Sequence, residues 1–223
     1  MSVAAAAVSG SEQGRDVDVA DLAYTRGWSS AAIAVHSILS ISTPMFLRLR
    51  VDGHPSLLVD FRHHAYDWAT PAEYFPADPA SVMVETEPTT DSAPALFLLP
   101  GRNLDSLLWM MGLNSFGDVS ASWLRPGDRY RLIRWPNLSQ LRHTVAQMHM
   151  TAMLGNAALT PVELASVAGV PLADAQRLIN ALSLMGILEA TPAAEAPAPL
   201  SARAVQSAPA HGLFARLRAR LGF

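Results

Sequence analysis

Four side chains that could bind a metal or exchange protons lie close together in the sequence: Asp60, His63, His64 and Asp67. Imidazole and carboxylate groups are common metal ligands and common acid–base catalysts. On an extended strand, however, His64 shares a face with Asp60 while His63 shares the opposite face with Asp67, because successive side chains alternate. The four groups therefore do not converge. The pattern favours an ordinary surface at the end of a strand over a metal or catalytic site.

The other patterns that could carry chemistry are equally weak. Met148, His149, Met150 and Met153 could bind a soft metal, but on a helix Met148 and Met153 are expected to fill the core. There is no Gly-x-Ser-x-Gly elbow, no phosphate-binding glycine loop and no dinucleotide fingerprint. We therefore expect no catalytic residues, no cofactor and no metal. An unrecognised enzyme built around residues 60–67, or a nucleotide-binding protein, stays open as an alternative.

An arginine-rich and aromatic stretch is the best candidate for contact with phosphate or nucleic acid. Guanidinium groups and aromatic rings can hold phosphates and bases. Arg129 and Arg131 share one face of a predicted strand, whereas Arg134 lies on the other face. The residues considered for this contact are Arg129, Arg131, Arg134 and Arg177.

Composition narrows the class of protein. Of 223 residues, 50% are hydrophobic and 16% are charged, which is sufficient for a packed core. The absence of cysteine excludes disulfides, thiolate zinc sites and cysteine nucleophiles. A net charge of −3 argues against non-specific binding of the whole chain to polyanions. No apolar stretch reaches the ~18 residues of a membrane span, and residues 1–25 look like a disordered leader without a signal peptide, so we expect a cytoplasmic protein.

Residues 26–140 are predicted to form an α+β domain with an antiparallel sheet. Met45–Val51 alternates apolar residues with Arg48 and Arg50, which is the pattern of a half-buried strand. The dipeptide Asp52-Gly53 then predicts a hairpin. Trp28–Ser42 fits either a short helix or a buried apolar segment. Further strands are expected at Ser56–Arg62, Ser81–Glu87, Ala95–Leu99 and Arg129–Trp135, and a helix is expected from the N-cap Asn103 to about Gly112.

Residues 141–190 are predicted to form a small domain of three helices. The first helix is expected over Thr144–Leu154. The second begins with a capping box, because Thr160, Pro161 and Glu163 occupy the N-cap, first and third positions, and it ends at Gly169. The third helix runs from about Pro171 to Gly186, and a short strand is expected at Ile187–Ala190. Apolar faces are expected at Val145, Met148, Ala152 and Met153 on the first helix, and at Leu172, Ala175, Leu178, Ile179, Leu182 and Met185 on the third.

The motifs Leu159–Ala165, Gly169–Leu172 and Leu182–Glu189 resemble those of winged-helix families. The segment 144–190 is similar to the C-terminal domain of the DprA family of DNA-processing proteins and to small winged modules of bacterial signalling proteins. The resemblance implies a winged-helix fold, and winged helices bind DNA or proteins. The hairpin wing that should follow Glu189 is replaced by an alanine- and proline-rich segment, so the domain lacks a clear wing. The N-terminal domain resembles no family that we recognise.

The third helix offers little to a DNA duplex. Duplex binding normally requires several Lys or Arg side chains to neutralise phosphates. The positions expected to be exposed carry one cation against one acid, and they are Asp174, Gln176, Arg177, Asn180, Ser183 and Leu184. Direct DNA binding is therefore the less favoured interpretation.

The end of the chain is predicted to be a tether with a basic amphipathic motif. Residues 191–210 are rich in alanine and proline and should form a linker. Residues 211–223 place four apolar side chains on one side of a helical wheel with arginines flanking them. The partner-binding residues predicted here are Leu213, Phe214, Leu217, Leu221, Arg216 and Arg220. Their partner would be a groove on another protein, with peripheral membrane contact as the alternative.

Together these features predict a non-enzymatic bacterial adaptor or regulatory subunit. It would act by protein–protein interaction through the winged-helix-like module and the tail. A DNA-associated transcriptional regulator that uses the helix-turn-helix is the alternative.

Overall fold

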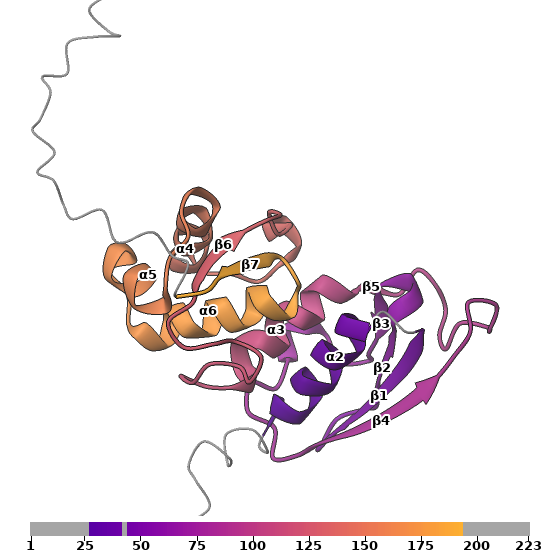
Figure 1. Ribbon diagram of the computed structural model, residues 1–223. Coiled ribbons are helices and arrows are strands. Elements are labelled where there is room, and N and C mark those ends of the chain that lie inside the picture. The colour runs from indigo at the N-terminus through magenta and orange to yellow at the C-terminus, as the bar shows by residue number, and fades with distance from the viewer. Residues whose placement is uncertain (1–26, 42–43, 194–223) are drawn as a thin grey trace, which may run out of the picture.

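The computed structural model describes residues 27–41 and 44–193. Helices and antiparallel sheets are mixed along the chain, which confirms the predicted α+β class (Figure 1). The leader 1–25, the tail 211–223 and most of the linker lie outside the described residues. The helices and strands are α2 Ser29–Ile41, β1 Met45–Val51, β2 Leu57–Asp60, β3 Ala65–Asp67, β4 Val82–Pro88, β5 Arg102–Asn103, α3 Leu104–Ser115, β6 Arg129–Leu132, α4 Val145–Asn156, α5 Pro161–Ala168, α6 Leu172–Leu184 and β7 Leu188–Thr191.

The first sheet has the strand order β4-β1-β2-β3-β5, and every pairing in it is antiparallel. The predicted hairpin at Asp52-Gly53 is confirmed, with Phe46 opposite Asp60. The predicted strand Ser56–Arg62 stops earlier because Phe61–His63 form a 3-10 turn. The strand expected at Ala95–Leu99 is wrong: these residues form bends and a turn. Pro94 and Pro100 flank the run and carry no N–H for a ladder.

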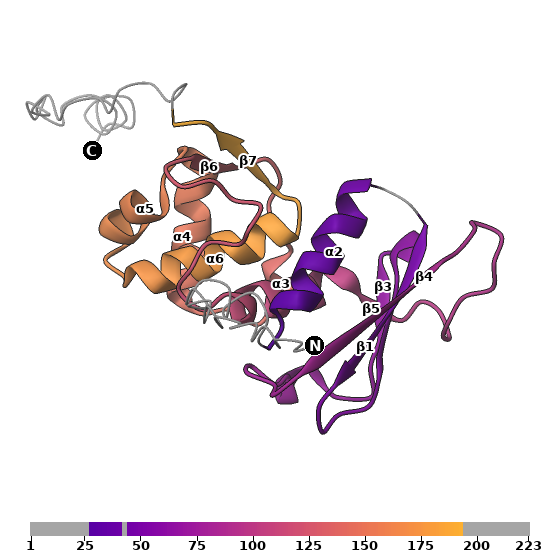
Figure 2. The same cartoon turned by 60° about the horizontal axis from the view of Figure 1, so that its bottom comes forward.

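Helices α2 and α3 lie between the first sheet and the C-terminal elements (Figure 2). The ambiguous segment is helical over Ser29–Ile41, and Ala31, Ala32 and Val35 of this helix are fully buried. Asn103 caps α3 as predicted, by accepting a hydrogen bond from the Asp105 N–H. The helix continues past the expected end at Gly112 to Ser115, and this glycine instead marks the point where α3 packs against α6. A β-carbon added there would lie 2.4 Å from the Ala181 Cα.

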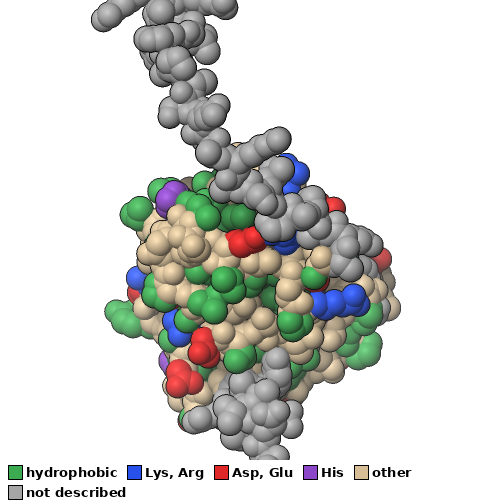
Figure 3. Space-filling view, turned by 60° about the vertical axis from the view of Figure 1, so that its left-hand side comes forward, with side chains coloured by type: hydrophobic (Ala, Val, Ile, Leu, Met, Phe, Trp, Pro, Cys, Tyr) green, Lys and Arg blue, Asp and Glu red, His purple; other side chains and the backbone are tan. Residues whose placement is uncertain are grey.

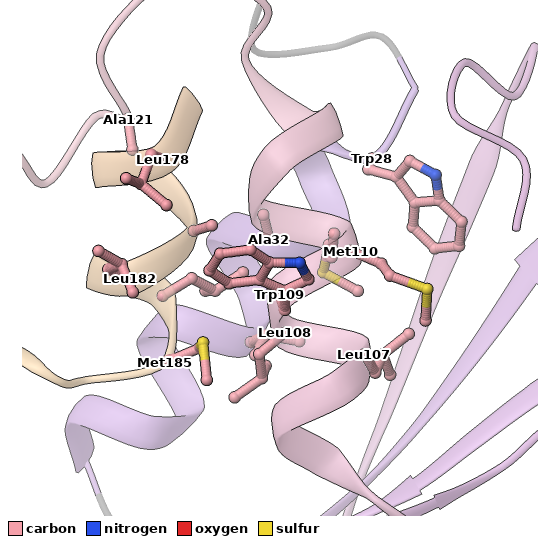
Figure 4. Packing of buried hydrophobic residues seen from close by; sticks show 14 of the residues in the cluster. Trp28, Ala32, Leu107, Leu108, Trp109, Met110, Ala121, Leu178, Leu182 and Met185 are labelled. Carbon is pink, nitrogen blue, oxygen red and sulfur yellow. The ribbon is translucent and has the colours of Figure 1, made fainter. Parts of the chain in front are cut away.

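A single hydrophobic core extends from the first sheet to the C-terminal helices. In Figure 4, Leu108 and Trp109 extend from α3 towards Leu182 and Met185. The indole N–H of Trp109 donates to the Arg142 carbonyl at 2.8 Å, so the segment before α4 is also attached to α3.

The C-terminal elements are joined by a second sheet of β6 and β7. The strand expected at Arg129–Trp135 ends at Leu132, and it pairs with the predicted terminal strand rather than with the first sheet. Leu159 bridges to the other side of Tyr130 through two backbone hydrogen bonds of 2.9 and 3.0 Å. Strand β7 includes Thr191, which was assigned to the linker.

The caps predicted for α5 are confirmed. The Thr160 hydroxyl accepts from the Glu163 N–H, the Glu163 carboxylate accepts from the Thr160 N–H, and Gly169 ends the helix at φ +66°. Helix α4 has a second capping box, formed by Thr144 and Gln147. Over the ranges 27–41 and 44–193, no helix is long and apolar enough to cross a membrane.

Candidate interaction surface

Part of the side of helix α4 that the sequence predicts to be buried faces solvent instead. The side chains that it buries are Met150, Thr151 and Leu154. Val145 is 78% exposed and Met148 is 44% exposed. The predicted apolar face was therefore wrong for these two residues, while Ala152 and Met153 are half-buried. An apolar period shows which residues share a side of a helix, but not whether the protein itself covers that side.

Exposed and half-buried residues of α4 lie in one row, because positions three and four apart are neighbours on a helix. Val145, Met148 and Ala152 follow one another in this way, and Gly155 extends the row. Trp135 lies against Gly155, where an added β-carbon would meet the indole ring at 2.8 Å. The Trp135 side chain is 56% exposed. We call Trp135, Val145, Met148 and Ala152 the α4 stripe.

The α4 stripe is almost free of charge. Helix α4 contains no Asp, Glu or Arg, and its only titratable side chain is His149. The cores of protein interfaces have the composition of this stripe: they are depleted in charge and enriched in Trp and Met. In the space-filling view of the side that carries α4 and α5, hydrophobic side chains are spread over the surface, with several separate charged groups between them (Figure 3).

Helix α6, which a DNA-binding interpretation would need, is covered on the side expected to be free. Gln176, Asn180 and Leu184 were expected to be exposed, but all three are buried, Asn180 to 1% exposure. Asp174 and Arg177 are exposed as expected, and Ser183 is half-buried. The prediction failed because α3 and the segment 116–124 occupy this side of the helix.

A polar network attaches segment 116–124 to α6. The Asn180 side-chain oxygen accepts from the Ala121 N–H at 3.0 Å, and its amide donates to the Val119 carbonyl at 2.9 Å. Gln176 donates to the same Asn180 oxygen at 3.0 Å. The Trp123 indole N–H donates to the Ser183 hydroxyl at 3.1 Å. Polar positions that looked like a surface are therefore internal hydrogen-bonding partners.

The four arginines considered for phosphate contact do not form one site. Arg129 forms an ion pair with Glu163 and donates to the Ala158 carbonyl at 3.1 Å. Arg177 donates to the Gly117 carbonyl at 3.2 Å and lies 3.8 Å from Asp174. Arg131 and Arg134 are exposed. Two of the four are thus committed to contacts within the protein.

The Arg129–Glu163 pair connects β6 to the start of α5. Burial disfavours the charged form of Glu163, but hydrogen bonds from the Thr160 N–H and the charge of Arg129 outweigh it and lower the pKa of Glu163 below its usual value. The carboxylate is therefore held in its charged form, and it serves the capping box and the ion pair together.

Within the cluster at residues 60–67, Asp60 forms an ion pair with Arg62, and its carboxylate lies 4.0 Å from the His63 Nε2. Asp60 is fully buried, and its carboxylate accepts hydrogen bonds of 2.6 and 3.0 Å from the Arg62 guanidinium. Arg62 lies over the Phe46 ring at 4.6 Å and also donates to the Thr90 and Ala93 carbonyls. The pair thus fastens the loop after β4 onto the sheet.

His64 takes a different partner, on helix α3. It has a positive φ of 47°, and its Nε2 lies 2.8 Å from Asp105. The hydrogen bond from His64 lowers the pKa of Asp105 most, against the opposing effect of burial, and Arg134 contributes to the lowering. In the part of the chain that the structure describes, no three His, Asp or Glu side chains form a group that could hold a metal ion.

One feature of the surface was missed by sequence reasoning: the contact of Trp135 with Gly155, which joins residues that are distant in the chain. The glycine within α4 was the one available signal, since glycine in a helix often marks a close approach. The predicted tail residues, Leu213 to Leu221, lie outside the described residues.

In comparisons with known proteins, no family model, no curated protein and no solved structure matches this chain.

Proposed function

We propose that this chain is a non-enzymatic adaptor or regulatory subunit that binds another protein through the α4 stripe. The elements β6, α4, α5, α6 and β7 would form a winged-helix-like module in the cytoplasm. Their order, with Leu159 bridging to β6 between α4 and α5, supports that interpretation. The stripe would be the working surface of the module.

The exposure of Trp135 is the observation that carries the proposal. Tryptophan is among the residues that contribute most to binding when a partner buries them. Here more than half of the residue is exposed, against Gly155 at the far end of the row that carries Val145 and Met148. The α4 stripe offers an apolar centre without the charges that would oppose its desolvation.

The covering of α6 favours a protein partner over DNA. A recognition helix must present its side chains to the groove of the duplex. On α6 the side that carries Asn180 and Gln176 is packed against segment 116–124. The cation nearest the start of this helix, Arg177, is paired with Asp174.

Affinity capture with the full chain tests the proposal. The bait is compared with a double variant, Trp135→Ala with Met148→Asp, and with Val167→Asp, which changes an apolar side chain that is 63% exposed on α5. Proteins captured by the wild type should be lost from the double variant and kept by the Val167→Asp control. Equal capture by all three baits would contradict a role for the stripe.

Two further arms separate the alternatives. Removal of residues 211–223 tests the expected contribution of the tail in the same assay. Electrophoretic mobility of a DNA duplex at about 50 and 200 mM salt tests the DNA-associated alternative, because binding to phosphates weakens steeply with salt. Sequence-specific binding that survives the higher salt and is abolished by Arg177→Glu would favour the regulator over the adaptor.

A further inference from the structure

Strand β4 forms one edge of the first sheet and pairs only with β1 among the described strands (Figure 1). Its seven residues leave one side of the backbone without a neighbouring strand. An edge strand of this kind is a template for a further strand. The chemistry of the edge indicates which strand would fit.

The two faces of β4 differ sharply at this edge. Glu85 and Glu87 lie on the outer face of the sheet, where Arg50 reaches Glu85 at 2.7 Å and Arg48 lies 3.9 Å from it. Val82 and Val84 lie on the inner face and are only half-buried. Their partners on β1, Val51 and Leu49, are buried, so the inner face is covered on the β1 side and incompletely covered at the edge.

The strand that already pairs with β4 shows what complements it. In β1 the sequence Leu47-Arg48-Leu49-Arg50-Val51 alternates apolar residues for the inner face with arginines for the outer face. The chain contains a similar alternation near its end, Leu217-Arg218-Ala219-Arg220-Leu221. Residues 217–221 therefore fit a strand, whose side chains alternate between two faces, as well as the amphipathic helix predicted from the sequence.

We propose that residues 217–221 of this chain add to the free edge of β4 as a strand. Arg218 and Arg220 lie opposite Glu85 and Glu87 on the outer face, and Ala219 lies opposite Thr86. One of Leu217 and Leu221 then lies opposite Val84 of the inner face, and the other lies opposite Pro88. The pairing of Ala219 with Thr86 is the same whether the added strand is parallel or antiparallel, because Ala219 lies midway between the two arginines and Thr86 lies midway between the two glutamates.

A second copy of β4 fits this edge less well. If two β4 strands paired antiparallel over all seven residues, Glu85 of one copy would lie opposite Glu85 of the other. Like charges directly opposite one another are destabilising. The cationic tail removes this conflict.

The connection is long enough. From Ala193 to Leu217 there are 24 residues, which span at most ~80 Å when extended. A domain of the described size is about 40 Å across. The proposal does not depend on the α4 stripe. It replaces the predicted role of the tail as a helix that binds a partner, because a tail paired with β4 is not free to form that helix.

Engineered disulfides in the full chain test the proposal, and the absence of native cysteine makes the readout clean. The chain with Thr86→Cys and Ala219→Cys is compared with one carrying Ser166→Cys and Ala219→Cys. Thr86 and Ser166 are both exposed. Under mild oxidation the first pair should form an intramolecular disulfide at least about tenfold faster than the second, because pairing raises the local thiol concentration above that of a free tether.

Charge reversal in the Thr86→Cys/Ala219→Cys chain tests the ionic contacts. Arg218→Glu with Arg220→Glu should slow disulfide formation to the rate of the control pair. Glu87→Arg is then combined with Arg218→Glu alone and with Arg220→Glu alone. Only the combination in which the new glutamate faces residue 87 should restore the rate: Arg218→Glu if the added strand is antiparallel, and Arg220→Glu if it is parallel. Glu73→Arg changes the same charge at an exposed site outside β4 and should restore nothing. Equal rates for the two cysteine pairs, or a disulfide formed only between two chains, would overturn the proposal.

Discussion

Gly112 of α3 and Ala181 of α6 approach so closely that a β-carbon at Gly112 would lie 2.4 Å from the Ala181 Cα and 3.0 Å from its nitrogen. The obstacle is backbone and cannot rotate away. This contact joins the helix behind the first sheet to the helix at the centre of the C-terminal elements, so it determines how closely the two parts of the core pack.

Replacing Gly112 with alanine should therefore lower the free energy of unfolding by about 2 kcal/mol, because overpacking outweighs the gain of about 1 kcal/mol in helix propensity. Gly155→Ala is the matched control. There the added carbon meets only the ring of the exposed Trp135, which can move. Chemical denaturation should show Gly155→Ala as stable as the wild type or more so. Equal losses for both variants would contradict the close approach.

Replacing Thr160 with alanine should cost about 1 kcal/mol of stability, since the Glu163 N–H loses its acceptor at the start of α5. Thr160→Ser keeps the hydroxyl and should retain most of the stability. Thermal unfolding of the three proteins checks the prediction. A serine variant as unstable as the alanine variant would assign the effect to the lost methyl group instead.

Replacing Asn180 with alanine should cost about 2–4 kcal/mol, because the Ala121 N–H and the Val119 carbonyl would lose their partner next to a buried site. Asn156→Ala removes an exposed hydrogen bond to the Ala152 carbonyl and should change stability by less than about 0.5 kcal/mol. Urea unfolding curves give both values. A loss for Asn180→Ala no larger than for Asn156→Ala would mean that segment 116–124 does not depend on this network.

The His36 ring stacks on Trp123 with ring centroids 4.0 Å apart, and burial lowers its pKa below the ordinary value of 6.5. The unfolded chain then takes up a proton at higher pH than the folded chain. This contribution to stability is therefore complete above pH 6.5 and is lost as the pH falls through 6.5 towards the lowered pKa.

His36→Phe keeps an aromatic ring without the titration. The difference in unfolding free energy between wild type and variant should be constant at about pH 8–9 and should shift in favour of the variant at about pH 5–6. Denaturation at each pH measures it. A difference that does not change with pH would show that His36 titrates alike in the folded and unfolded chains.

Local signals in the sequence were reliable. The hairpin at Asp52-Gly53, the cap at Asn103 and the capping box at Thr160 depend on neighbouring residues alone, and all three are present. The α+β class follows from such signals. The predictions that failed depend on contacts between distant residues. Strand Arg129–Leu132 pairs with a strand almost sixty residues later, and the alternation of apolar and polar residues does not identify the strand with which it pairs.

The candidate surface could be predicted only in part. The residues Val145, Met148 and Ala152 were recognised as one apolar side, but only packing decides whether such a side is core or surface. The polar positions of α6 show the converse error: Asn180 looks like a surface residue by type, and its burial depends on segment 116–124. The exposure of Val145 and Met148 and the burial of Asn180 both depend on parts of the chain that are distant in the sequence.

The antiparallel pairing of β6 with β7 has a mechanical consequence. Arg129 lies opposite Thr191, so the chain enters and leaves the second sheet at the same point. Tension applied to the chain beyond Thr191 loads this terminal pair first and opens the pairs in turn, as a zipper opens, instead of shearing them all at once. The last pair to part would be Leu132 with Leu188. A load on the end of the chain would thus peel β7 away from β6 at low force.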